Sequence, residues 1–197
     1  MMKTVRFVFA LACAAALTTN AQWVPFNHPG YQSIFSVTTT PGTILMVSAS
    51  QGVIKSTDGG SAWNPANTGM TGSTVESVYY NNVSLFSGTH VGVYKSTDNA
   101  VSWTLSNTNL PTASAANCVK QFFHYNGTTF AVYNGAVGSN AGGIWRSTDE
   151  GANWFSGNGG LSSNMIIGQI AQMNGVLYAA TTSGLYQSTN LGVGWTA

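Results

Sequence analysis

The stretch Gly52-Val-Ile-Lys-Ser56-Thr-Asp58-Gly-Gly60-Ser-Ala-Trp63 decides the fold, because the chain contains three further copies of it. Each copy has an acidic or amide residue two positions after Ser and a Trp five positions later. The other copies are Gly92-Val-Tyr-Lys-Ser96-Thr-Asp98-Asn-Ala100-Val-Ser-Trp103, Gly143-Ile-Trp-Arg-Ser147-Thr-Asp149-Glu-Gly151-Ala-Asn-Trp154 and Gly184-Leu-Tyr-Gln-Ser188-Thr-Asn190-Leu-Gly192-Val-Gly-Trp195. The tryptophans are 40, 51 and 41 residues apart. A period near 40 residues indicates a repeat architecture.

Each repeat contains the elements of four short strands. A first apolar or alternating run leads through a two-residue turn into a second strand, and the Gly-to-Ser and Trp segments supply two more. Four strands per unit are typical of a propeller blade, whereas a β-solenoid repeats at shorter periods. The expected first strands are 34–38, 75–80, 119–125 and 165–173, the turns Pro41-Gly42, Asn81-Asn82, Asn126-Gly127 and Asn174-Gly175, and the second strands 44–49, 83–87, 128–133 and 176–181.

The sequence therefore predicts an all-β fold, a β-propeller of four-stranded antiparallel blades. The expected blades are 31–70, 71–110, 111–161 and 162–197. Segment 22–30 contains Trp23, which stands 40 residues before Trp63, and reads as a closing outer strand. Four blades could close in principle, but the prediction favours part of a larger propeller.

The composition excludes several classes of protein. Only six Lys or Arg and five Asp or Glu occur among 197 residues, and the net charge is +1. Such a chain has no basic surface for a nucleic-acid backbone. A hydrophobic share of 44% argues against disorder.

The N-terminus has the layout of a secretory signal peptide. Lys3 and Arg6 precede an apolar run over 7–17, and Ala21 is a small residue suited to cleavage. The run is too short to span a bilayer, and a lipoprotein signal at Cys13 is the less favoured alternative. We expect residues 1–21 to be removed and the mature chain to be secreted or displayed at the cell surface, without a transmembrane segment.

The repeated Ser-x-Asp-x-Gly-x-x-Trp pattern resembles the Asp-box, or BNR repeat. This repeat is known from sialidase-type propellers, sortilin-like receptors, photosystem II assembly propellers and xyloglucan hydrolases. Four copies in register make the resemblance specific. The residues that carry it are Ser56, Asp58, Gly60, Trp63, Ser96, Asp98, Trp103, Ser147, Asp149, Gly151, Trp154, Ser188, Asn190, Gly192 and Trp195.

These residues are expected to be structural. An Asp or Asn can accept backbone N–H bonds within its own turn, Gly can adopt a positive φ, and Trp can pack against a neighbouring blade. Two departures agree with this interpretation: Ala100 replaces Gly, and Asn190 replaces Asp. Asn can still hold a turn, but it could not transfer a proton.

No catalytic residue is predicted. Sialidases hold a carboxylate with three arginines, and only Arg146 follows the leader. Glycosidases need two facing carboxylates, yet only Glu76 and Glu150 remain once the repeated Asp residues are set aside, and Glu150 lies in a repeat turn. A Gly-x-Ser-x-Gly elbow is absent as well.

No metal or other cofactor is predicted, because His-x-His, Glu-x-x-His and Cys-x-x-Cys spacings are missing. Cys118 is the one cysteine after the leader and is expected to be a small buried hydrophobe. A reactive thiol is not expected, because it would need nearby cationic residues or the start of a helix.

Two insertions distinguish the third repeat from the second. One precedes its first strand, at 111–117, and the other joins its second and third strands, at 134–142. Strands alternate in direction, so both insertions should emerge at the same end of the blade. Loops on a rigid scaffold commonly bind ligands, and the alternative is a tolerated insertion. The candidate ligand surface is His90, Tyr133, Asn134, Ser139 and Asn140.

The expected function is an exported, noncatalytic module for protein or glycan recognition or for surface scaffolding. Two alternatives stay open. The chain could be the N-terminal part of a propeller glycoside hydrolase whose catalytic residues lie elsewhere, or it could resemble the assembly-factor propellers.

Overall fold

The computed structural model describes residues 33–71, 74–111, 118–138 and 142–197. The predicted signal peptide, the segment 22–30, and Ser139 and Asn140 lie outside these residues. The described residues form strands and turns without a helix, so they include no helix that could cross a membrane.

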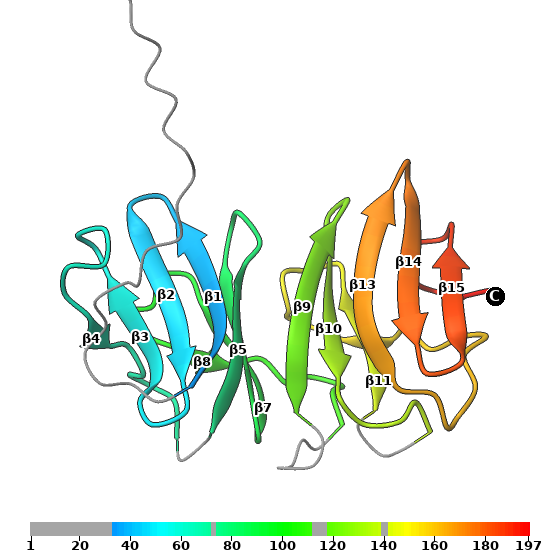
Figure 1. Cartoon of the computed structure of the whole chain (residues 1–197), viewed down its shortest axis with the longest axis horizontal. Coiled ribbons are helices and arrows are strands. Elements are labelled where there is room, and N and C mark those ends of the chain that lie inside the picture. The colour runs from blue at the N-terminus through cyan, green and yellow to red at the C-terminus, as the bar shows by residue number, and fades with distance from the viewer. Residues whose placement is uncertain (1–32, 72–73, 112–117, 139–141) are drawn as a thin grey trace, which may run out of the picture.

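Four antiparallel sheets follow one another along the chain, and we number them as blades one to four (Figure 1). Blade one is β1 (Ile34–Thr40), β2 (Thr43–Ser48), β3 (Gly52–Ser56) and β4 (Asn64–Pro65). Blade two is β5 (Val75–Tyr80), β6 (Leu85–Thr89), β7 (Gly92–Ser96) and β8 (Thr104–Leu105). Blade three is β9 (Val119–Tyr125), β10 (Thr128–Tyr133), β11 (Gly143–Ser147) and β12 (Phe155–Ser156). Blade four is β13 (Ile167–Met173), β14 (Val176–Thr181) and β15 (Gly184–Ser188).

The fourth strands are the weakest part of each sheet. They contain two residues in blades one to three, and in blade four a single bridge between Gln187 and Thr196 replaces the strand. The prediction of four full strands per blade is therefore corrected for blade four, whose sheet has three strands.

Three of the four predicted two-residue turns are confirmed, since Thr40 pairs with Thr43, Tyr125 with Thr128 and Met173 with Val176. The turn at Asn81-Asn82 is wrong by one residue. Asn81 bonds to Ser84 through its backbone, and its side-chain oxygen accepts from the N–H groups of Val83 and Ser84. The turn residues are therefore Asn82 and Val83, and β6 begins at Leu85 rather than at Val83.

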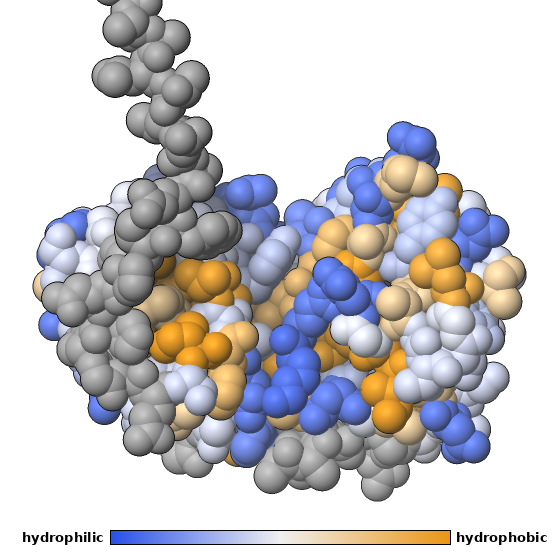
Figure 2. All heavy atoms as spheres, in the orientation of Figure 1, coloured by the Kyte–Doolittle hydropathy of each residue, from blue (hydrophilic) through white to orange (hydrophobic). Residues whose placement is uncertain are grey.

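The first strands of successive blades lie side by side: β1 contacts β5, β5 contacts β9, and β9 contacts β13. Side-chain groups bridge them, because Ser36 Oγ donates to the carbonyl of Val78 and Ser77 Oγ to that of Val119. Figure 1 shows the blades in chain order along the long axis, with blades one and four at opposite ends. The surface in Figure 2 is notched between the two halves, with a hydrophilic band near its centre.

The hydrophobic core is divided among the blade boundaries. One buried cluster joins blades one and two, a second joins blades two and three, and a third joins blades three and four. Phe86, Tyr133 and Trp154 belong to the second cluster. Each blade therefore depends on its neighbour for burial of its apolar faces.

Three of the four repeated tryptophans fasten these boundaries, whereas the indole N–H of Trp63 donates to the carbonyl of Gly60 in its own turn. The indole N–H of Trp103 donates to the carbonyl of Ala66, that of Trp154 to Ser106, and that of Trp195 to Gly157, at 2.8–2.9 Å. Each acceptor belongs to the preceding blade. A buried indole needs such a partner, so the Trp position links packing with a hydrogen bond between blades.

Candidate functional site

The four Ser-x-Asp turns have the same hydrogen bonds. In the first turn, Ser56 Oγ donates to Asp58 Oδ1 and accepts from the N–H of Gly60, both at 2.8 Å. Asp58 Oδ1 also accepts from the N–H of Ala62, at 2.9 Å. The corresponding acceptors are Asp98, Asp149 and Asn190, each bonded within its own turn. These side chains do not converge on a common site.

The two departures from the pattern preserve this geometry. The side-chain oxygen of Asn190 takes the place of the Asp oxygen, accepting from Ser188 Oγ and from the N–H of Gly194. Ala100 adopts φ 59° where Gly60 has 93°, and its N–H still donates to Ser96 Oγ. A left-handed Ala is strained, whereas Gly is not.

Acid should weaken the fold through Asp98. Hydrogen bonds from the side chain and backbone of Ser102 lower its pKa to about 2, against about 3.9 in an unfolded chain. The stabilisation is present above the unfolded value and is lost as pH falls from about 4 toward 2. We expect urea unfolding at pH 6 and pH 2.5 to differ less for Asp98→Asn than for the wild type. The reciprocal control, Asn190→Asp, should increase the difference.

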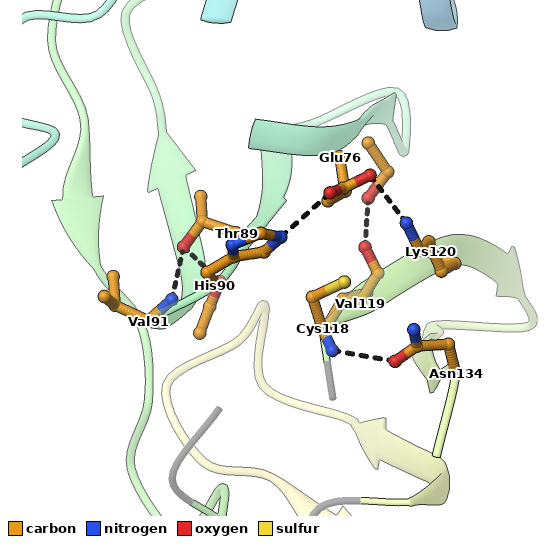
Figure 3. Close-up of polar contacts among 10 residues, drawn as sticks. Glu76, Thr89, His90, Val91, Cys118, Val119, Lys120 and Asn134 are labelled. Atoms are coloured by element: carbon orange, nitrogen blue, oxygen red, sulfur yellow. Dashed lines mark hydrogen bonds and ion pairs between the residues drawn. The ribbon is translucent and has the colours of Figure 1, made fainter. Parts of the chain in front are cut away.

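The connections that flank the third blade's insertions meet at one end, at the boundary of blades two and three. The N–H of Cys118 donates to Asn134 Oδ1 at 2.9 Å, and the N–H of Asn134 donates to the carbonyl of Cys118 at 3.1 Å. His90, in the turn between β6 and β7, lies beside them (Figure 3).

The predicted ligand surface is wrong at Tyr133, because this side chain is buried. It is the last residue of β10, it pairs with Gly143, and none of its surface is exposed. Its side chain packs in the second core cluster, so it does not border an accessible surface. Its hydroxyl has no hydrogen-bond partner among the described residues. Burial raises the pKa of Tyr133, and the neighbouring Cys118 adds to this effect.

Glu76 joins the two neighbouring segments at this end. Its Oε1 lies 2.8 Å from His90 Nε2 and its Oε2 lies 2.6 Å from Lys120 Nζ (Figure 3). Glu76 and Lys120 occupy corresponding positions near the starts of β5 and β9, so this ion pair crosses the boundary between blades. Partial burial raises the pKa of Glu76, but the bonds from Lys120 and His90 outweigh it and lower the pKa below its ordinary value.

The surroundings of Cys118 also differ from the prediction. Its side chain is buried, as expected, but the expectation that no cation lies near it is wrong, because Lys120 interacts with it. Burial raises the pKa of the thiol, and the charge of Lys120 opposes this rise. The ligand atoms of Glu76, His90 and Cys118 all lie within 4.8 Å of one another. This donor set was not predicted, because its members are far apart in the sequence.

A second repeated feature was also missed. Asn67, Asn107 and Asn158 each lie four residues after a repeated Trp. Their side-chain oxygens accept from the N–H groups of Val53, Val93 and Ile144, at 2.7–2.8 Å. The constant spacing after Trp was the signal that could have found them.

Every carboxylate of the described residues takes part in structural contacts. The three Asp residues hold their own turns, and Glu76 bonds to His90 and Lys120. Both oxygens of Glu150 accept from Asn81 Nδ2 in the preceding blade, at 3.0–3.1 Å. Each Asp and Glu side chain of the described residues is therefore held by contacts within its own turn or across a blade boundary.

No family model matches the chain, and no curated protein matches its sequence. Solved structures do match. An ancestral GH74 enzyme superposes with TM-score 0.69 at 21% identity, over 88% of this chain and 25% of that one. The extracellular domain of BT4673 from B. thetaiotaomicron superposes with TM-score 0.66 at 13% identity, over 86% and 23%. The fold is a β-propeller. The chain spans about a quarter of the length of these two proteins.

A shorter propeller protein gives the same result. YCF48 from Cyanidioschyzon merolae matches with TM-score 0.53 at 15% identity, over 83% of this chain and 55% of that one. At these identities the likeness concerns the fold alone. An enzyme, an extracellular domain and YCF48 share it, so the fold does not determine the activity.

Proposed function

We propose that this chain is an exported, noncatalytic propeller module that recognises a protein or glycan ligand. The observation that carries the proposal is the use of the carboxylates. Asp58, Asp98 and Asp149 hold turns, while Glu76 and Glu150 hold neighbouring blades together. A glycosidase needs one carboxyl group to give a proton and another to act as base or nucleophile.

The Asp-box assignment belongs to this proposal. The repeated hydrogen bonds of the Ser-x-Asp turns, and the indole bonds between blades, are what a structural role of these residues requires. The proposed domains are a leader over 1–21 and a propeller over 22–197. Export rests on the leader's pattern, and one structural neighbour is an extracellular domain.

The proposed recognition surface lies at the end of blades two and three where His90, Cys118 and Asn134 come together. It comprises His90 and Asn134, both half-buried, together with Ser139 and Asn140 from the sequence of the same connection. Tyr133 is excluded by its burial. Loop residues on a rigid sheet scaffold can recognise a ligand without taking part in chemistry.

The test separates binding from turnover. The purified chain is assayed for sugar release from xyloglucan and sialyllactose, and for binding to immobilised glycans and peptides. We expect saturable binding without turnover, weakened by Asn134→Ala and unchanged by Phe155→Ala, which alters an exposed outer strand. Hydrolysis that disappears in Glu76→Gln or Glu150→Gln would contradict the proposal.

A second candidate is a glycoside hydrolase of which this chain is one part. The observation that favours it is the match to two GH74 enzymes, over 25% and 30% of their length. In that case, the catalytic carboxylates would come from residues outside those that the structure describes, and the isolated chain would again show no turnover.

A further inference from the structure

Three ligand types that zinc favours meet at the boundary of blades two and three. The carboxylate of Glu76 comes from β5, the imidazole of His90 from the following hairpin, and the thiol of Cys118 from the residue just before β9. Figure 3 shows Cys118 below Glu76, with His90 to its left. Cys, His and Glu all bind zinc through the atoms that face one another here.

The distances are close to those of a zinc site. Ligand atoms bonded at about 2.0–2.3 Å in a tetrahedron lie about 3.3–3.7 Å apart. The three ligand atoms here lie within 4.8 Å of one another, and His90 Nε2 is 2.8 Å from Glu76 Oε1. Small side-chain movements would suffice, with the bond between His90 and Glu76 replaced by two bonds to the metal.

The surrounding contacts hold the ligands in place. The backbone N–H of His90 donates to Thr74, and Thr89 Oγ1 fixes the turn by accepting from the N–H of Val91. Asn134 Oδ1 accepts from the backbone N–H of Cys118 and so holds that residue in place. Contacts of this kind orient metal ligands and affect affinity by about 10–100-fold.

We propose that Glu76, His90 and Cys118 bind one Zn²⁺ and so cross-link blade two to blade three. Three protein ligands leave the fourth position to water. Binding converts the thiol to a thiolate, and its proton passes to solvent. Lys120 competes with the metal, because its ammonium group lies 2.6 Å from Glu76 Oε2. The zinc site shares His90 with the proposed recognition surface, but zinc binding does not require that a glycan or peptide binds there.

The test is a titration of the full chain with Zn²⁺ against a chromophoric chelator, and with Co²⁺ by absorbance. We expect one equivalent to bind, with a thiolate-to-cobalt charge-transfer band. Both His90→Ala and Cys118→Ser should weaken binding at least tenfold, and the band should vanish in Cys118→Ser. Lys120→Met should tighten binding several-fold, since it removes a positive charge and leaves the three ligands.

The matched control is His124→Ala. This half-buried histidine bonds to Thr129 and is not part of the donor set, so its variant should bind as the wild type does. The His90 side chain is 24% exposed, so His90→Ala tests the site even where Cys118→Ser destabilises the fold. The proposal fails if the charge-transfer band is absent, or if His90→Ala and His124→Ala bind equally well. Neither result bears on the binding of glycans or peptides.

Discussion

Trp154→Ala is expected to lower the free energy of unfolding by about 3–5 kcal/mol. The indole is completely buried between blades two and three. Its ring packs edge-on against that of Phe86, with 6.1 Å between the ring centroids. Truncation leaves a cavity and also removes the donor to the carbonyl of Ser106, which is 2.9 Å from the indole nitrogen. A loss of this size is a large share of the stability of a typical domain.

Chemical unfolding followed by circular dichroism would measure this loss. The matched control is Phe155→Ala, which truncates the adjacent aromatic residue on β12, where half of the side chain is exposed. The control should change the free energy by less than about 0.5 kcal/mol. Equal effects of the two substitutions would show that the indole does not hold the blade boundary together.

The repeat made the sheets predictable. Its hairpin turns and Ser-x-Asp turns are held by contacts between residues close together in the sequence, so strand positions could be inferred without knowledge of distant contacts. The misplaced turn in blade two also has a local cause. At Asn81, the side chain bonds forward to the backbone of Val83 and Ser84, and this shifts the turn by one residue.

The cluster around Glu76 could not be predicted in the same way. Glu76, His90 and Cys118 belong to different strands and turns, and they meet only because blade three packs against blade two in a particular register. After the predicted leader, Glu76 and Lys120 are the two charged residues outside the four repeated Gly-to-Trp segments. The repeat places Glu76 and Lys120 at corresponding positions of adjacent blades. Whether they form an ion pair depends on how closely β5 and β9 approach each other.

For Tyr133, the sequence suggested an exposed side chain where the structure has a buried one. Its place beside an insertion suggested an exposed loop residue, but the ladder of β10 continues to it through the pair with Gly143. All six residues of β10 are buried, because blades pack against both faces of this strand. Burial on both faces removes the alternation of apolar and polar residues from which exposure is usually inferred.

Gly88→Ala should be the second strongly destabilising substitution, with a loss of about 2–3 kcal/mol. Gly88 lies in β6 at the point where blade two meets blade three. A Cβ there would lie 2.3 Å from the carbonyl oxygen of Val119 and 2.5 Å from Ser77 Oγ, which bond to each other across the boundary. The backbone of β9 would have to move away, and this would also separate Glu76 from Cys118.

The control for Gly88→Ala is Gly168→Ala, another substitution within a strand. A Cβ at Gly168 would meet only the carbonyl oxygen of Ala180, at an ordinary 3.5 Å, so this variant should be as stable as the wild type or slightly more stable. Thermal unfolding of both variants measures the difference. If Gly88→Ala unfolds at the temperature of Gly168→Ala, blades two and three do not approach as closely as the bond between Ser77 and Val119 requires. Because the donor set of Glu76, His90 and Cys118 spans this same boundary, weaker cobalt binding by Gly88→Ala at temperatures where it remains folded would connect blade packing to the metal site.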